Sequence, residues 1–509
     1  MNHLAITSIL LPLAAFVCSM VLTACVRRWA VRTDFVSRPR EDRYNRNVIA
    51  LGGGIAIFWT IALFILIGAA MVKFVIAPGH LSFIDESLSQ HTQGFMEKIN
   101  DLLIVVAAVF VLHLMGLWDD KKHLGPFVKL AVQFAAAFVA AWFADIRVEM
   151  FIESKLFTTL LSVFWIVLMI NAFNFLDNMD GASAGIALIA TCVLMAAAVR
   201  SGQVFVGTLG AVFVGALLGF LVFNFPPAKI FMGDCGSMVV GFFVALLTLR
   251  TTYYNEEAGT ALYSVFMPAI VMAVPLYDFV SVTFLRLKQG KSPFVGDTQH
   301  FSHRLKRRGL SDRQVALTLY LATLCTGLGA ILLQQADFVG AILIAAQTVM
   351  VLVFIAIGYL FIAVIDLMHV LSYQGMSIFK DYDFYANQLW VAARYMESLT
   401  LLLAFAGPGR LNQIIRKIGT KGILAIYSLI TAILLATIFV WRIFPVCFIA
   451  NQGQTEFKII SEYIICVIIT AAILLLWKRR KNFDDKTYKF LILAMVLTIF
   501  QELSFTLYS

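Results

Sequence analysis

The chain has 509 residues, of which 61% are hydrophobic and only 14% are charged, and its formal net charge is +9. A soluble protein of this length carries far more charge, so the composition excludes that class and indicates a polytopic membrane protein. We therefore expect membrane lipid, and no nucleic acid, among its partners.

Apolar runs of about 20 residues, long enough to cross a bilayer, follow one another along the chain. Helices are expected, because lipid offers the backbone no hydrogen-bond partners and alternating strand patterns are absent. The predicted fold class is all-α, with about 10 or 11 transmembrane helices in residues 1–350 and about four or five in residues 351–509. The predicted spans are 4–26, 48–76, 102–118, 126–144, 157–175, 184–199, 204–223, 236–250, 262–285, 315–333, 337–365, 388–406, 422–441, 459–477 and 488–507.

Basic residues gather in two of the connecting segments. Residues 27–46 contain seven arginines and three acids, and residues 286–308 contain seven basic residues and one acid, Asp297. Segments rich in Lys and Arg stay in the cytoplasm. Counting spans from residue 27 then places 119–125, 171–181, 224–237 and 286–313 on that same side. Alternatively, these charges only set the topology or contact anionic lipid head groups.

Each of these four segments holds polar residues that are costly at membrane depth and are therefore functional candidates. In the first, Asp119 and Asp120 are adjacent. Mg²⁺ is commonly bound by one or two carboxylates together with substrate phosphates. A paired acid can also leave one member as a general base. The alternative is a solvated Asp-Asp-Lys-Lys stop at the membrane interface.

The second segment spaces Asn171, Asn174 and Asp177 three residues apart, which places them on one stripe of a helix end, and Asp180-Gly181 then suits a turn. Oxygens on such a stripe can bind a metal, a nucleotide or sugar hydroxyls. The alternative is that these side chains cap the helix and form the turn.

The third segment, Gly233-Asp234-Cys235-Gly236-Ser237, precedes an apolar run. Its glycines permit close approach of the backbone. Asp234 either ligates a metal or, like Ser237, caps the following helix.

In the fourth segment His300 and His303 lie three residues apart and Arg304 follows. Two histidines can indicate zinc, but no third ligand of matching kind is evident. Arginine, in contrast, recognises phosphate with two parallel hydrogen bonds, and Lys306 and Arg307 add further charge. We favour an anion site over zinc.

Together the four segments predict phosphoryl transfer. An anion transporter would instead place polar groups at mid-span in broken helices.

The chain resembles the polyprenyl-phosphate N-acetylhexosamine-1-phosphate transferases over residues 1–350, because several motifs occur in that family's order. They are Gly52-Gly53-Gly54, Leu117-Trp118-Asp119-Asp120, Asn171-Ala-Phe-Asn174-Phe-Leu-Asp177, the Pro226 to Ser237 segment and the His300/His303 loop. Such enzymes transfer a sugar 1-phosphate from a UDP-sugar to undecaprenyl phosphate, release UMP, and start cell-envelope polysaccharides such as O-antigen. The resemblance implies the same activity, in the bacterial cytoplasmic (inner) membrane with the active site on the cytoplasmic face.

The resemblance also implies a cofactor, partners and site residues. The cofactor is Mg²⁺, with Mn²⁺ as an alternative, and the substrates are a UDP-N-acetylhexosamine and undecaprenyl phosphate; a homodimer is left open. The expected catalytic residues are Asp119, Asp120 and Asp234, and the expected metal ligands are Asn174, Asp177 and Asp234. The expected substrate-binding residues are Asn171, Asn178, Asp180, Asn224, His300, His303 and Arg304.

Two positions depart from the family pattern. The common Asp-Gly-x-Asp-Gly is Asp177-Asn178-Met179-Asp180-Gly181 here, and Asn tolerates a left-handed backbone better than most residues. Many relatives have His-x-His-His-Arg where this chain has His300-Phe-Ser302-His303-Arg304. Muramyl-pentapeptide transferases instead tend to consecutive histidines, so we favour an N-acetylhexosamine donor such as UDP-GlcNAc.

From about residue 356 the chain resembles membrane-associated sensor domains of the third MASE type. The resemblance rests on 366–376, 388–398 and 444–463. We expect residues 351–509 to be such a domain, cut short within its pattern. Residues 337–372 form either one span or two short crossings. Arg394 and Glu397 either pair with each other or sense a ligand. The alternative function for the whole chain is a membrane sensor or receptor with a degenerate transferase half.

Overall fold

The structure is a computed structural model. It describes residues 3–38, 48–78, 92–148, 152–254, 260, 262–292, 300–307, 310–334, 340–342, 344–345, 348, 365, 368–369, 385–405, 422, 425–449, 453–478, 480 and 485–507. The chain divides into two compact units. The first consists of Met1–Gly259 and Val265–Gly327, and the second of Thr260–Ser264 and Leu328–Ser509.

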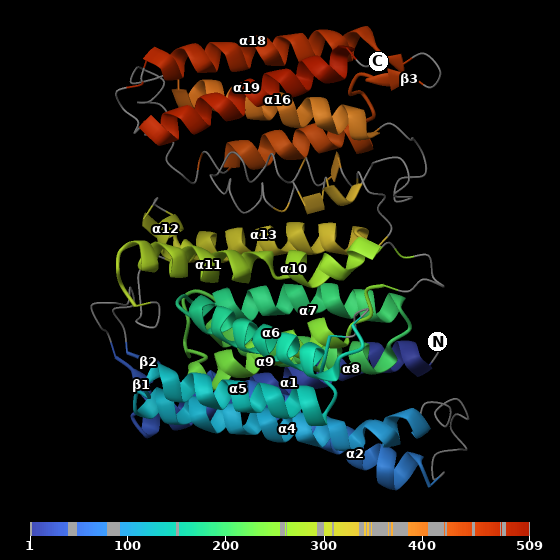
Figure 1. The fold of residues 1–509 in the computed structure, drawn as a ribbon, viewed down its shortest axis with the longest axis vertical. Coiled ribbons are helices and arrows are strands. Elements are labelled where there is room, and N and C mark those ends of the chain that lie inside the picture. The colour runs from blue at the N-terminus through green and yellow to red at the C-terminus, as the bar shows by residue number, and fades with distance from the viewer. Residues whose placement is uncertain are drawn as a thin grey trace. The chain divides into compact units, whose positions relative to one another are not determined.

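Helices make up nearly all of the described chain, so the all-α prediction is confirmed (Figure 1). From the N-terminus to Phe266 they are α1 (His3–Arg32), α2 (Gly53–Met71), the π-helix η1 (Val72–Ile76), α4 (Thr92–Lys121), α5 (Pro126–Phe143), α6 (Lys155–Leu176), α7 (Ala182–Arg200), α8 (Val204–Asn224), α9 (Asp234–Arg250) and the 3-10 helix η2 (Leu262–Phe266). They are followed by α10 (Met267–Val271), α11 (Ala273–Lys288), α12 (Phe301–Arg307), α13 (Asp312–Leu332), α16 (Tyr385–Phe405), the π-helix η3 (Ala436–Val440), α18 (Glu456–Lys478) and α19 (Asp485–Leu507).

Nine described helices are long and apolar enough to cross a membrane, and a tenth span results if the pair Leu262–Val271 and Ala273–Lys288, bent by 64°, counts as one. These helices make the chain a multi-pass membrane protein. The predicted span 337–365, and the question of one or two crossings in 337–372, lie almost wholly outside the described residues.

Small residues let the helices of the first unit approach one another closely. A Cβ atom on Gly219 of α8 would lie 2.5 Å from the Phe16 carbonyl of α1. The Ser19 hydroxyl donates to the Ala216 carbonyl at 2.6 Å between the same two helices. Close backbone approach with an interhelical hydrogen bond is how membrane helices associate, since lipid supplies no hydrophobic drive between them.

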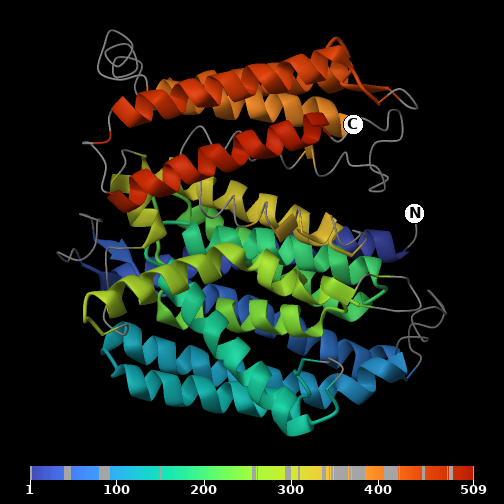
Figure 2. The ribbon, with the colours of Figure 1, turned by 45° about the horizontal axis from the view of Figure 1, so that its top comes forward.

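Helix α9 lies at the centre of the first unit and is almost entirely buried. It packs against α2, α4, α6 and α7 (Figure 2). A Cβ atom on Gly54 of α2 would lie 2.2 Å from the Gly236 nitrogen, and one on Gly116 of α4 would lie 2.4 Å from the Cys235 Cα atom. The N-terminus of α9 is therefore held between α2 and α4, and this position places Asp234.

Two very short hairpins interrupt the helices in the described part of the chain, and the sequence pattern did not predict them. In the first unit β1 (Val36–Ser37) pairs antiparallel with β2 (Ile49–Ala50), and Ala50 also bridges to Ile230. In the second unit β3 (Phe448–Ile449) pairs with β4 (Gly453–Gln454). The first hairpin matters for the site, because it joins the segment before α2 to the segment before α9.

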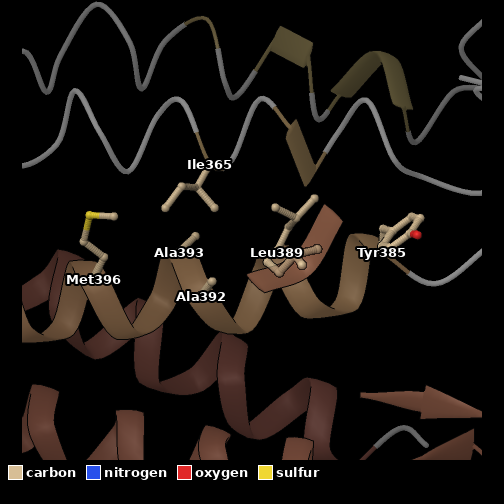
Figure 3. Packing of buried hydrophobic residues seen from close by; sticks show 7 residues of the cluster. Ile365, Tyr385, Leu389, Ala392, Ala393 and Met396 are labelled. Carbon is tan, nitrogen blue, oxygen red and sulfur yellow. The ribbon is translucent and has the colours of Figure 1, made fainter. Parts of the chain in front are cut away.

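The second unit has its own apolar core. Figure 3 shows Ile365 facing α16, with Leu389, Ala393 and Met396 on the side of that helix turned toward it. Ile438 belongs to the same cluster, and a second cluster joins α16, α18 and α19 around Ile465. Arg394 and Glu397 form an ion pair on α16, which is the structural alternative predicted for them. Whether they also sense a ligand stays a prediction.

Candidate active site

Two aspartates on different helices share one lysine at the edge of the first unit's core. Near the C-terminal end of α4, the Asp119 Oδ2 atom lies 2.5 Å from the Lys129 Nζ atom of α5. The same ammonium lies 2.8 Å from Oδ2 of Asp234, the first residue of α9. The other Asp119 oxygen accepts the Leu124 backbone N–H at 2.6 Å. Two carboxylates therefore converge on a single cation at the ends of α4 and α9.

Asp120 has a different role from its neighbour. Its two oxygens accept the backbone N–H groups of Asp234, at 2.8 Å, and of Cys235, at 3.1 Å. These N–H groups belong to the first turn of α9, which has no partners for them within the helix. The N-cap position is Gly233, and no side chain caps it. Capping by Asp234 or Ser237, one alternative considered from the sequence, is therefore not observed; Asp120 caps the helix from α4.

Gly233 is required for this arrangement. Its φ of +75° favours glycine, and a Cβ atom there would lie 2.5 Å from an Asp120 carboxylate oxygen.

The asparagines predicted on one stripe of α6 do lie at its C-terminal end, but they have different partners. The Asn174 side chain donates to the Ser237 hydroxyl of α9 at 2.9 Å. Asn171, one turn earlier, donates to Gln133 of α5 at 2.8 Å and to the Val167 carbonyl. Asp177 is the C-cap residue, directly after the last residue of α6. Asn174 is thus tied to the first turn of α9, whereas Asn171 bonds a neighbouring helix.

The turn between α6 and α7 is joined to the segment that follows α8. Asn224 accepts the Gly181 N–H at 3.0 Å and donates to the Ile230 carbonyl at 2.9 Å. Asp180 accepts the Ala228 N–H at 2.9 Å. Burial raises the pKa of the Asp180 carboxyl above its ordinary value, while the Ala228 hydrogen bond acts in the opposite direction. Both residues therefore shape the loop that leads into Asp234.

The segment from His300 to Arg304, here called the donor loop, is anchored by a buried carboxylate of α11 that the sequence analysis did not single out. Asp278 of α11 lies with its Oδ2 atom 2.9 Å from the Nδ1 atom of His300, and its Oδ1 atom accepts the Phe301 N–H at 2.6 Å. Arg304, one turn later on α12, donates to the Ser281 hydroxyl at 3.0 Å and stacks near the ring of Tyr277. The structure thus brings His300, His303 and Arg304 together along α12.

The donor loop and the α6–α7 turn are directly connected. The Ser302 hydroxyl donates to the Asn178 side-chain oxygen at 2.6 Å, and the Asn178 amide donates to the Phe175 carbonyl at 2.6 Å. Figure 1 labels α12, α6 and α7, the elements that this link joins. The α12 segment is therefore tied to the turn that carries Asn178 and Asp180, whereas Asn171 lies within α6 and bonds α5 instead.

Sequence analysis missed several residues that hold this site together: Lys129, Gln133, Asp278 and Ser281. A signal for two of them was available. Lys129 and Asp278 are single charged residues inside apolar runs, and such residues are functional candidates in a membrane helix. Gln133 and Ser281 gave no comparable signal, since neutral polar residues are common between packed helices.

The donor atoms at the carboxylate pair suit Mg²⁺. The ammonium of Lys129 marks a cation position between Asp119 and Asp234, and oxygen ligands are those that Mg²⁺ prefers. The described residues contain no group of three or more His, Cys, Asp or Glu placed to hold a metal. A site of two carboxylates, completed by water and substrate phosphate, is the usual arrangement for this ion. The catalytic and metal-binding roles of the named residues stay predictions.

Comparison with known proteins identifies two regions. Residues 102–252 match the model of glycosyl transferase family 4, and residues 338–509 match that of a membrane-associated sensor domain. The first match covers Asp119, Asp120 and Asp234 but ends before the donor loop. The second confirms the resemblance noted from residue 356 onward.

Similar curated proteins share names of one kind. A probable undecaprenyl-phosphate N-acetylglucosaminyl 1-phosphate transferase of Bacillus subtilis is 29% identical over 325 residues, which are 62% of this chain and 82% of that protein. A decaprenyl-phosphate N-acetylglucosaminephosphotransferase of Mycobacterium tuberculosis is 32% identical over 336 residues, 61% of this chain and 79% of that protein. An undecaprenyl-phosphate alpha-N-acetylglucosaminyl 1-phosphate transferase of Yersinia pestis is 23% identical over 376 residues, 70% and 92% of the two chains.

Three observations indicate the same family: the order of the motifs, the carboxylates at the ends of α4 and α9, and the names of these relatives. The chain belongs to the polyprenyl-phosphate N-acetylglucosamine-1-phosphate transferases of glycosyl transferase family 4.

Proposed function

We propose that the protein transfers N-acetylglucosamine 1-phosphate from UDP-GlcNAc to undecaprenyl phosphate and releases UMP. The observation that carries the proposal is the convergence of Asp119 and Asp234 on one cation, in a chain whose relatives are named for this transfer to undecaprenyl or decaprenyl phosphate.

In the proposed reaction a phosphate oxygen of the lipid attacks the phosphorus that carries the sugar. A new phosphorus–oxygen bond forms, the bond to the bridging oxygen of the pyrophosphate breaks, and UMP leaves with that oxygen. The protein's task in such a transfer is to position the reactants and to balance charge. Mg²⁺ bound at Asp119 and Asp234 would neutralise the pyrophosphate.

The chain's own residues have separate tasks in this scheme. Asp120 holds the first turn of α9, and so fixes where Asp234 lies. Lys129 balances the two carboxylates. The residues of α12 face the sugar and pyrophosphate of the donor, and Asp177, Asn178 and Asp180 lie in the turn joined to α12 through Ser302.

The remaining expectations about context are part of the same proposal. Basic segments at 27–46 and 286–308 support a cytoplasmic site in a bacterial inner membrane. The transfer would start a cell-envelope polysaccharide such as O-antigen.

The test is lipid-dependent release of UMP by the purified full chain in detergent, with UDP-GlcNAc, undecaprenyl phosphate and MgCl₂. Asp234→Ala should abolish release, and EDTA should stop it until Mg²⁺ or Mn²⁺ is returned. Asp101→Ala is the matched control, because Asp101 forms a surface pair with Lys98 in the described part of the chain. Folded protein that releases no UMP with UDP-GlcNAc or any other UDP-N-acetylhexosamine would overturn the proposal.

The second candidate function is sensing, and the match of residues 338–509 to a membrane-associated sensor domain favours it. Sensing would either accompany the transferase activity or, if the transferase half is degenerate, be the function of the whole chain. Lipid-dependent UMP release would exclude a sensor whose transferase half is degenerate. A folded chain that releases no UMP with any UDP-N-acetylhexosamine would support such a sensor.

A further inference from the structure

We infer that Asp278 is a positioning residue for the proposed transfer: it holds the ring of His300 so that the Nε2 atom faces the UDP-sugar. The inference rests on the proposed function. Asp278 is 1% exposed on the apolar helix α11, and His300 is 6% exposed at the start of α12. A buried carboxylate on such a helix is costly unless its oxygens are satisfied.

Both Asp278 oxygens have donors. Oδ1 accepts the Phe301 backbone N–H at 2.6 Å, and Oδ2 lies 2.9 Å from the His300 Nδ1 atom. An ionised carboxylate only accepts hydrogen bonds, so Nδ1 of His300 must carry the proton. Within the described part of the chain no group hydrogen-bonds the other ring nitrogen, Nε2. The pairing therefore assigns the proton to Nδ1 and makes Nε2 the acceptor nitrogen of the ring.

The surroundings restrict the ring to this orientation. The ring of Phe175 meets that of His300 edge to face, with centroids 5.6 Å apart. The ring of His303 lies 6.0 Å away. A half-turn of the imidazole would point a carbon at Asp278 and lose the hydrogen bond. A carboxylate that is hydrogen-bonded to one ring nitrogen commonly fixes the tautomer and orientation of a histidine that acts through the other nitrogen.

Asp278 also fixes the backbone that carries the other donor-loop residues. The Phe301 N–H opens α12, and the Arg304 N–H donates to the His300 carbonyl at 3.0 Å. One carboxylate thus sets the His300 ring and the first turn that presents His303 and Arg304. A prearranged set of donors loses less entropy when an anionic ligand binds than a mobile set does.

The main test is Asp278→Asn, which keeps the size of the side chain. Its amide has one acceptor oxygen, so either the Phe301 N–H or the His300 Nδ1–H loses its partner. Loss of a hydrogen bond to a charged group is worth roughly tenfold to a hundredfold, and kcat/KM for UDP-GlcNAc should fall by that factor. The KM for undecaprenyl phosphate should not change.

His300→Asn provides the second variant. An asparagine amide can still donate to Asp278, so the loop stays anchored while Nε2 is lost. We expect its kcat/KM to fall at least as far as that of Asp278→Asn. In the double variant, Asp278→Asn should add less than about twofold, because residues that act through one another are non-additive.

Asp101→Asn is the matched control. Its carboxylate pairs with Lys98 near the start of α4, at 3.1 Å, and both side chains are partly exposed. A pair of this kind contributes little, so kcat/KM should stay within about twofold of the original.

Three outcomes would overturn the inference: unchanged kcat/KM for UDP-GlcNAc in Asp278→Asn, full activity in His300→Asn, or additive effects in the double variant. Equilibrium binding of UDP-GlcNAc, measured without lipid, separates this inference from the proposed function. A parent protein that binds UDP-GlcNAc but releases no UMP would refute the transfer, and weaker binding by Asp278→Asn would still support the inference. A parent protein that neither binds nor reacts would refute both.

Discussion

The hydroxyl of Ser302 donates a hydrogen bond to the side-chain oxygen of Asn178, 2.6 Å away, although 124 residues separate them. These are the two positions at which the chain departs from the motifs of the family it resembles. Ser302 is buried, and Asn178 is held in place by its second bond, to the Phe175 carbonyl. The two departures therefore contact each other, and together they tie α12 to the turn that carries Asp177 and Asp180.

Ser302→Ala should weaken this link. Removing a buried donor leaves the Asn178 oxygen without its partner, which costs about 1–2 kcal/mol of unfolding free energy. Because α12 is then held less firmly, the KM for UDP-GlcNAc should rise several-fold while kcat changes less. Thermal unfolding and steady-state kinetics measure the two effects. Ser201→Ala, which removes an exposed hydroxyl bonded to Thr252, is the control; equal changes in both variants would contradict the prediction.

Gly233→Ala should abolish activity in a protein that still folds. The new Cβ atom would lie 2.5 Å from an Asp120 oxygen and would displace that carboxylate from the first turn of α9. Gly202→Ala tests the backbone effect alone, because Gly202 has a similar φ of +70° and no atom within 4 Å of its Cβ position. Both variants should lose about 1 kcal/mol of stability from the left-handed backbone, but only Gly233→Ala should stop UMP release. Release by both would show that Asp120 tolerates displacement.

Asp120→Asn should lower kcat at least about tenfold through the position of α9. A carboxylate accepts the N–H groups of both Asp234 and Cys235, whereas an amide offers one oxygen and turns its own N–H₂ toward the other donor. The unsatisfied N–H costs about 1–3 kcal/mol, so the melting temperature should fall as well. Asp101→Asn, on the surface, should change neither quantity. Undiminished kcat in Asp120→Asn would remove Asp120 from the site.

Lys129→Met should make the stability of the protein depend more strongly on Mg²⁺. Asp119 and Asp234 lose the ammonium they share, and two carboxylates without a cation repel each other. An ion that binds only the folded state then stabilises it by mass action. The rise in melting temperature on adding MgCl₂ should be larger in Lys129→Met than in the parent protein. Lys98→Met removes an exposed lysine as control. Equal rises in all three proteins would place Mg²⁺ elsewhere.

Much of the architecture could be predicted from local sequence. Hydrophobic runs of about 20 residues have few alternatives to a membrane helix, and α4, α6 and α8 lie where those runs are. The rare polar residues at the ends of the runs were visible for the same reason, and so were Asp119, Asp120 and Asp234. The hairpin of β1 and β2 was not predictable, because two-residue strands leave no periodic pattern.

What each candidate residue contacts was decided by tertiary structure. Asp119 and Asp120 are neighbours in sequence, yet one shares Lys129 with Asp234 and the other caps α9. A helix turns each successive residue by about 100°, so adjacent side chains face different neighbours. Which neighbours those are depends on how α9 packs between α2 and α4.

The sequence by itself therefore determined the membrane class, the helices and the chemical types gathered at their ends. Only the packing of the helices decided three pairings: Lys129 with Asp234, Asp278 with His300, and Ser302 with Asn178. The physical reason is that hydropathy and helical periodicity act over a few residues. The rotation and separation of helices are set instead by close contacts between distant glycines, such as Gly54 against Gly236.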